Sequence, residues 1–287
     1  TKTDSESYSN STYGGAIDGN IITINENKYI TFSGNYTTSS GTGYGYGAHP
    51  ATPRSSGGAV YGDLFLTKNE YVLFDGNSAN AYSTINTSFT TYGGAICGEA
   101  HIQNNGYVTF RGNSVASTCT KITSPAVSAW GGAIYGTSVS ICNNTYVLFE
   151  GNYEVTGKET ELYQLRGIYA TGDVHLSAHA QNSIEFRDSI YSGGRLILND
   201  KFEENDQAGD IIFEGKYTAL ALSNLKSNYT APELENSLTS IVGGQTILND
   251  GRLIIRNGAI LQGNGLIVYA SASGTCNTTV SLQNSHL

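Results

Sequence analysis

The feature that most constrains this 287-residue chain is a pair of short motifs that occurs four times in the same order. Each GGA(I/V) tetrapeptide is followed 17 or 18 residues later by FxGN, whereas successive GGA(I/V) motifs begin 43, 36 and 38 residues apart. The length between the two motifs is fixed, and the length after FxGN varies. Such a repeat predicts stacked structural units. The invariant positions are Gly14, Gly15, Ala16, Ile17, Phe32, Asn35, Gly57, Gly58, Ala59, Val60, Phe74, Asn77, Gly93, Gly94, Ala95, Ile96, Phe110, Asn113, Gly131, Gly132, Ala133, Ile134, Phe149 and Asn152.

The composition favours short strands joined by tight turns. The chain has 35 Gly, 20 Tyr, 4 Pro and no Met, and Gly tolerates turns while Tyr, Thr, Val and Ile prefer extended backbone. Before each FxGN the residues alternate, so that Val72 and Phe74 share one face of a strand. Only residues 157–166 and 231–238 have a pattern compatible with helix. We therefore predict an all-β chain.

A spacing of 17 to 18 residues fits one coil of a parallel β-solenoid with three short strands. On this interpretation each repeat comprises two coils, with the Phe strand stacked directly on the GGA(I/V) strand. Roughly 14 coils with a rise of about 4.8 Å predict a rod on the order of 65 Å. Glycine turns the chain, Ala, Ile and Phe fill the interior, and the asparagines of FxGN form a hydrogen-bonded ladder.

The residue after each Phe alternates in charge along the chain. Two coils per repeat would place these residues about 10 Å apart, so we expect only weak pairing between them. The positions are Ser33, Asp75, Arg111, Glu150 and Arg187.

The second half of the chain contains similar strand-like segments but lacks the exact GGA(I/V) and FxGN motifs. Residues 184–188 and 211–215 are predicted to be further Phe strands, and residues 193–200 and 243–263 further coils. We predict a β-solenoid with four repeats over residues 1–166. Residues 167–287 would be a degenerate continuation of it, with an irregular insertion around 219–238.

Charge and cysteine content exclude several classes of partner. Fifteen Lys and Arg against 24 Asp and Glu give a net charge of −9, which argues against nucleic acid or a polyanionic polysaccharide as the main partner. The cysteines lack metal-binding spacing, so we expect no metal and no cofactor. Both disulfides and buried free thiols fit Cys97, Cys119, Cys142 and Cys276.

The alternation of four GGA(I/V) with four FxxN motifs resembles the chlamydial polymorphic membrane proteins. Residues 14–152 carry these motifs, and residues 184–190, 209–215 and 238–261 resemble the middle region of that family. The resemblance implies a right-handed parallel β-helix, similar to pectin lyases, that forms the passenger of a type V autotransporter. Such passengers are adhesins, antigens and virulence factors at the bacterial cell surface and outer membrane, or secreted after cleavage.

The same resemblance implies membrane attachment only through a C-terminal barrel, and we expect this chain to hold passenger alone, without leader or barrel. The implied partner is a host-cell surface receptor, either protein or glycan. Within the family the two motifs are associated with adhesion. Uncapped terminal coils would also expose strand edges, so self-association is a second expected interaction.

Periodic apolar positions normally face the interior, so we interpret the motifs as scaffold. The segments after FxGN, at 36–56, 78–92, 114–130 and 153–166, are expected to protrude as loops from one corner and to make the contacts. The first is rich in Tyr, Gly and Ser, a composition typical of recognition loops and also of flexible connectors. Its candidate receptor-binding residues are Tyr44, Tyr46, His49 and Arg54.

Two other functions compete with adhesion. A polysaccharide-cleaving β-helix enzyme needs gathered carboxylates, and the candidates for such a cluster on neighbouring coils are Asp173 with His175, and Asp188; ordinary turn carboxylates are the simpler interpretation. We therefore expect no catalytic residue and no enzyme. The second alternative is a passive surface antigen or decoy.

Overall fold

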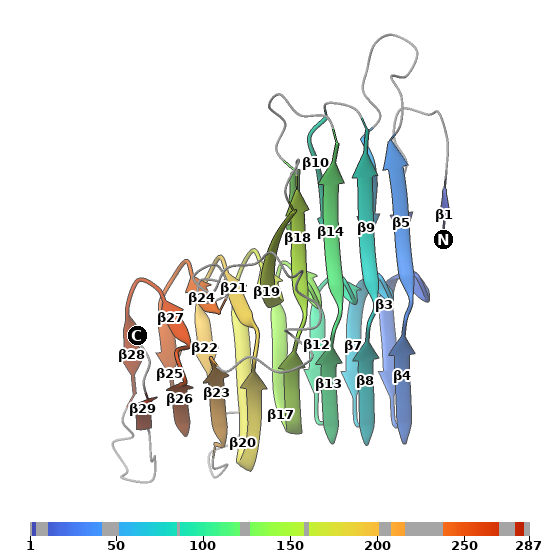
Figure 1. Ribbon diagram of the computed structural model, residues 1–287. Coiled ribbons are helices and arrows are strands. Elements are labelled where there is room, and N and C mark those ends of the chain that lie inside the picture. Colours follow the sequence, from blue (N-terminus) through green and yellow to red (C-terminus); the bar gives the residue numbers. More distant parts are fainter. Residues whose placement is uncertain are drawn as a thin grey trace.

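The computed structural model describes residues 2–3, 11–41, 52–84, 87–120, 127–157, 161–200, 208–215, 238–269 and 279–283. These residues form strands and turns without any helix, and the strands of successive coils pair in parallel (Figure 1). The arrangement is all-β and compatible with a β-solenoid. Within the candidate helix at 157–166, the described residues are strand: Gly157 ends β18 and residues 161–166 begin β19. The other candidate, 231–238, lies almost entirely outside the described residues.

Three parallel ladders run through the body of the molecule. The first contains the start of β3 (Ile17–Asn25) and of β7 (Val60–Thr67), then β11 (Ile96–Cys97), β16 (Ile134–Gly136), β19 (Glu161–Ala170), β21 (Ser189–Ser192), β24 (Thr239–Val242) and β27 (Ile260–Gln262). The second contains the rest of β3 and β7, β12 (Ala100–Gln103), β17 (Val139–Glu150), β20 (Val174–Phe186), β22 (Leu196–Leu198), β25 (Thr246–Leu248) and β28 (Leu266–Val268). The third contains β4 (Tyr29–Ser33), β8 (Tyr71–Asp75), β13 (Tyr107–Arg111), the ends of β17 and β20, β23 (Asp210–Glu214), β26 (Arg252–Arg256) and β29 (Thr279–Gln283).

The register corrects the expected number of coils per repeat. Ile96 pairs with Val60 and Ile134, and Phe110 pairs with Phe74 and Phe149. Each repeat is therefore one coil that contains both motifs, and the prediction of two coils with Phe above GGA(I/V) is wrong. The eight described strand segments of the third ladder, at about 4.8 Å each, correspond to roughly 38 Å rather than 65 Å.

Like residues stack on like in the core, which explains this register. The rings of Phe32, Phe74, Phe110, Phe149, Phe186 and Phe213 form one column with centroid separations between 4.7 and 5.4 Å. Aliphatic residues of the other two ladders complete the interior. The predicted Phe strands at 184–188 and 211–215 belong to this column, so the ladders continue through both halves of the chain.

The predicted asparagine ladder is present. The Oδ1 of Asn113 accepts hydrogen bonds from the backbone N and the Nδ2 of Asn77 at 3.0 and 2.9 Å. Its Nδ2 in turn donates to Asn152 Oδ1 at 2.8 Å and to the Phe74 carbonyl at 3.0 Å. A second ladder, which the sequence reading did not identify, has the same geometry at the corner between the second and third ladders of strands and contains Asn27, Asn69, Asn105 and Asn144.

The ion pairs also follow from one coil per repeat. Arg111 donates from Nε and Nη2 to the carboxylate of Asp75 at 2.9 and 2.8 Å, and Arg187 Nη1 lies 3.4 Å from Glu150 Oε1. The expectation that these residues would lie about 10 Å apart is wrong, because adjacent repeats are adjacent coils.

The segments after FxGN start at one corner, as expected, but they are not simple loops. Each leaves the body as one strand and returns as another, and together these strands form two packed sheets that we call the extension. Figure 1 shows β5, β9, β14 and β18 side by side above β4, β8 and β13. The outgoing sheet contains β5 (Tyr36–Gly41), β9 (Ser78–Ser83), β14 (Ser114–Cys119) and β18 (Tyr153–Gly157), with β1 (Lys2–Thr3) at its edge. The returning sheet contains β2 (Ser11–Tyr13), β6 (Arg54–Ser56), β10 (Phe89–Tyr92) and β15 (Val127–Trp130).

Small and hydroxyl-bearing residues fill the space between the two sheets. Ser55 Oγ donates to Thr37 Oγ1 at 2.6 Å and accepts from Thr12 Oγ1 at 3.2 Å, while Thr91 and Ser117 share a hydrogen bond of 2.6 Å. Side chains of this size let the sheets approach closely, and buried hydroxyls are tolerated because they bond one another.

The extension ends at the fourth coil. There β19 pairs antiparallel with β18 and then joins the first ladder. A buried ion pair fixes this junction, because Arg166 Nη1 donates to Glu154 Oε2 at 2.9 Å and Glu154 Oε1 accepts from the Gly131 N–H at 2.6 Å. We call an outgoing strand and the returning strand that follows it an excursion. After Phe186 the chain passes directly into β21, without an excursion.

Candidate binding surface on the extension

The outer face of the extension meets the body along a row of aromatic side chains, which we call the aromatic seam. Its members are all partly exposed. They are Tyr13, Tyr61, Tyr92, Trp130, Tyr135, Tyr169 and Tyr191.

The seam follows a diagonal rule between coils. The residue before each GG contacts the residue after GGA(I/V) in the next coil. Tyr13 lies 4.5 Å from Tyr61 between ring centroids, and Tyr92 lies 4.4 Å from Tyr135. Trp130 stacks on Tyr169 at 4.9 Å.

At diagonal positions that lack aromatic residues, the two paired side chains are still similar in size. Ser56 and Cys97 occupy one pair, and the Ser56 hydroxyl hydrogen-bonds the Cys97 thiol. Arg166 takes the position of the next ring, with its guanidinium carbon 5.6 Å from the Tyr169 centroid and 5.9 Å from that of Tyr191. The sequence contains the residues of these diagonal pairs, but the pairing can be recognised only when one coil is aligned with the next.

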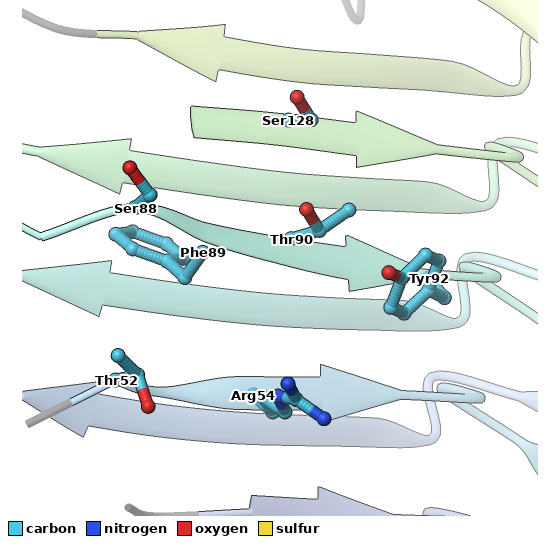
Figure 2. Close-up of a pocket in the computed structure, with 7 residues that line it drawn as sticks. All are labelled: Thr52, Arg54, Ser88, Phe89, Thr90, Tyr92 and Ser128. Carbon is cyan, nitrogen blue, oxygen red and sulfur yellow. The ribbon is translucent and has the colours of Figure 1, made fainter. Parts of the chain in front are cut away.

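A shallow pocket of about 260 Å³ lies beside the seam on the returning sheet (Figure 2). Figure 2 shows its side chains on β6, β10 and β15 and on residues just before β6 and β10. It is lined by Thr52, Arg54, Ser88, Phe89, Thr90, Tyr92 and Ser128. Tyr92 therefore belongs to both the pocket and the seam.

The candidate receptor-binding residues are only partly placed. Arg54 begins β6, is exposed and lines the pocket. Tyr44, Tyr46 and His49 lie outside the described residues. The repeat motifs from the second coil onward are almost wholly buried, and in the first coil the motif residues are half-buried apart from Ala16, which is exposed.

A second exposed aromatic column lies on the outer face of the third ladder. Tyr29, Tyr71 and Tyr107 stack at 5.3 Å with nearly parallel rings. Because each ring face covers its neighbour, mainly ring edges and hydroxyls face the solvent. These rings are more exposed than those of the seam, but they form one nearly parallel stack, whereas the seam pairs Tyr13–Tyr61 and Tyr92–Tyr135 are tilted by 39° and 46°.

Of the candidate catalytic residues, Asp173 lies within electrostatic range of His175, but Asp188 lies beyond the opposite end of β20 and does not join them. Asp173 precedes β20 and accepts hydrogen bonds from the backbone N and Nη2 of Arg195, each at 2.7 Å. Asp188 follows β20 at its other end, where it terminates the asparagine ladder. Both carboxylates hold structure together, since each is occupied by donors of an adjacent coil.

Within the described chain, Cys97, Cys119 and Cys142 are buried and are not joined by disulfides, while Cys276 lies outside the described residues. Burial raises the pKa of Cys97 to about 12. Nowhere in the described ranges do three His, Cys, Asp or Glu side chains gather as metal ligands. In the same ranges no helix has the length and apolar character to span a membrane.

Comparison of the chain with protein-family models, curated proteins and solved structures gave no match.

Proposed function

We propose that this chain is the surface-exposed passenger of an autotransporter-type adhesin, folded as a right-handed, pectin-lyase-like β-helix. The extension would be its contact surface. One observation carries the proposal: the segments that vary in length form a sheet pair whose outer face combines partly exposed aromatic residues with a hydroxyl-lined pocket. The resemblance to the polymorphic membrane proteins supports the location at the bacterial surface or in the secreted fraction.

The physical form of the extension suits binding. The strand β10 pairs with β6 and β15, and Trp130 on the edge strand β15 stacks on Tyr169, so the contact residues Tyr92 and Trp130 are held in place before a partner arrives. A preorganised surface loses less conformational entropy on association than a flexible loop. Tyr and Trp also provide large amphipathic contacts with few rotatable bonds. The proposed partner is a receptor on the host-cell surface.

The motifs themselves are assigned the scaffold role. Ala95, Ile96 and Phe110 are fully buried, so a partner that approaches the folded chain meets the outward residues of the extension first. Substitutions in the motifs would reduce adhesion by disrupting coils.

A binding assay with cultured host cells tests the proposal. The Tyr92→Ser, Trp130→Ser double variant should lose most binding of the purified chain while keeping its circular dichroism spectrum, because both side chains are partly exposed. Tyr71→Ser is the matched control, since Tyr71 is exposed on the third ladder, away from the seam. Equal binding by the double variant and the wild type would reject the seam as contact surface. Failure of the wild type to bind any host cell would favour the passive antigen.

A further inference from the structure

Arg54 stands apart from the other arginines of the described chain. Each of the others forms an ion pair with a carboxylate, usually on a neighbouring coil, whereas Arg54 has no ion-pair partner among the described residues. It is exposed and lies on the rim of the pocket. The paired arginines are Arg111, Arg166, Arg187, Arg195, Arg252 and Arg256.

Among the described residues that line the pocket, none is acidic and could occupy this guanidinium. In a chain with a net charge of −9, an unpaired arginine in a neutral pocket is an available site for an anion. The guanidinium is planar and offers two parallel N–H donors, which match the two oxygens of a carboxylate.

The remaining lining is typical of a site for a polyol. Four of its seven residues, Thr52, Ser88, Thr90 and Ser128, carry hydroxyls that both donate and accept. Thr90 and Ser128 are paired positions on β10 and β15, so their hydroxyls are next to each other on the outer face. Tyr92 adds an aromatic surface at the edge of the seam.

We propose that this pocket binds the carboxylate-bearing terminal sugar of a glycan. Arg54 holds the carboxylate, the hydroxyls of Thr90 and Ser128 bond the ring substituents, and Tyr92 packs against the apolar side of the ring. The inference rests on the proposed adhesin function and names the chemical class of its receptor.

Size and charge limit the ligand to one acidic sugar. The volume of about 260 Å³ is slightly below the range of about 300–1,000 Å³ usual for small-molecule sites, so only a terminal unit enters. A polysulfated or polyuronic chain bears many negative charges, so the net negative charge of the protein would repel it. A single carboxylate on an otherwise neutral glycan avoids this repulsion.

Titration calorimetry with the purified chain tests the site directly. The probes are 3′-sialyllactose, which carries one carboxylate, 3′-sulfolactose, which carries a sulfate at the same position, and neutral lactose. We expect the wild type to bind 3′-sialyllactose more tightly than either of the others, because the arginine fork matches a planar carboxylate.

Variants assign the effect to the pocket. Arg54→Gln should weaken binding of 3′-sialyllactose by about tenfold or more, since a hydrogen bond to a charged group contributes about 1.5–3 kcal/mol. Arg54→Lys should weaken it by a smaller factor because the charge remains but the fork is lost. Arg252→Gln is the matched control: it removes one positive charge from β26 and should leave the affinity unchanged. Equal affinity of wild type and Arg54→Gln would overturn the proposal, as would a preference for 3′-sulfolactose or lactose.

Adhesion assays separate this inference from the function on which it rests. Treatment of host cells with a sialidase should reduce binding of the wild-type chain to the level of Arg54→Gln. If the wild type binds treated and untreated cells equally, the acidic-sugar receptor is wrong while the adhesin function stands. If 3′-sialyllactose binds but the chain does not bind cells, the adhesin function fails and the sugar site remains.

Discussion

At the scale of single residues, asparagine is the unit that joins one coil to the next. The side-chain oxygen of Asn113 accepts from the preceding coil and its amide nitrogen donates to the following one. An amide uses both ends in this way, whereas a carboxylate or an apolar side chain cannot. The ladder therefore requires the amide group of asparagine and not only a side chain of similar size.

Replacement of a central ladder residue is expected to be costly. Asn113→Ala removes the buried acceptor of the Asn77 N–H and Nδ2, and one donor each from the Phe74 carbonyl and Asn152 Oδ1; an unsatisfied buried group costs about 1–3 kcal/mol. Urea unfolding monitored by circular dichroism should show a decrease of about 2–4 kcal/mol in the free energy of unfolding. Asn27→Ala, at the exposed end of the second ladder, should cost less than about 1 kcal/mol. Similar losses for both variants would contradict the role of burial.

Asp188 is the exception that ends the ladder. Its carboxylate accepts from the Gly151 N–H at 2.7 Å, the Asn152 N–H at 3.1 Å and the Asn152 Nδ2 at 2.6 Å. Complete burial outweighs these donors and raises the pKa of Asp188 to about 7. A carboxyl group at this position joins the regular repeats to the degenerate half.

The raised pKa of Asp188 predicts a pH dependence of stability. Between the ordinary aspartate pKa of about 4 and about 7, the folded chain holds a proton that the unfolded chain releases. The contribution of this group to the free energy of unfolding is therefore greatest at low pH and falls as the pH rises through this window. Urea unfolding of wild type and Asp188→Asn at pH 5 and pH 8 should show that the wild type loses more stability than the variant. Parallel pH profiles would refute the assignment.

At the scale of elements, the two glycines of GGA(I/V) serve different purposes. Gly93 has a φ of +60°, and a Cβ there would lie 2.0 Å from the Ile96 carbonyl oxygen. At Gly94 a Cβ would lie 2.0 Å from the Gly132 carbonyl oxygen of the next coil. The first glycine thus makes the turn, and the second lets coils pack at the spacing of parallel strands.

Alanine substitutions separate these requirements. Gly94→Ala places its methyl group against backbone that cannot move without opening the ladder, so we expect the variant to unfold or to accumulate as insoluble protein. Gly34→Ala has a similarly positive φ of +62° but no atom within 4 Å of the added Cβ, and should cost only about 1 kcal/mol. Soluble yield and thermal unfolding measure both effects, and a well-folded Gly94→Ala protein would show that the contact is not limiting.

The ion pairs between coils contribute little to stability by comparison. Arg111 and Asp75 are both partly exposed, and the hydrogen bond from Arg111 lowers the pKa of Asp75. Exposed pairs of this kind typically contribute about 0–1 kcal/mol. The paired charges therefore favour the correct register of neighbouring strands more than they strengthen the fold.

At the scale of the whole molecule, the body and the extension are separable in principle. Coils one to four carry an excursion after the ladder asparagine, whereas the chain passes from Phe186 into β21 at Ser189 without one. The first excursion lies toward the edge of both sheets of the extension. The body can therefore complete a coil with or without an excursion.

Deletion of residues 36–56, with Asn35 joined to Gly57, is expected to leave a folded body. The far-ultraviolet circular dichroism spectrum should keep its β character, while host-cell binding falls because Arg54 and the first part of the extension are removed. Replacement of the same segment by an unrelated Gly and Ser linker of equal length is the control for chain connectivity. A deletion variant that binds like the wild type would place the contact elsewhere.

The sequence alone was sufficient for the strands, the inward-facing residues and the FxGN asparagine ladder. These features depend on local alternation and on the repeated spacing, which appear in the chain itself. Phe74, Phe110 and Phe149 were identifiable as core residues because each lies in a strand of period two and recurs with its neighbours.

Only the tertiary structure decided which strands pair and what the variable segments become. A spacing of 17 or 18 residues between the motifs fits a complete short coil, and it also fits the path across the three body strands of a longer coil. The stacking of Phe on Phe in adjacent repeats shows that the longer coil is the one formed. The first three segments after FxGN are rich in Ser, Ala and Gly, which carry little strand preference of their own. They form sheets because the same segment of the next coil lies alongside and completes their hydrogen bonds, and the pocket and the aromatic seam exist only once those coils are stacked.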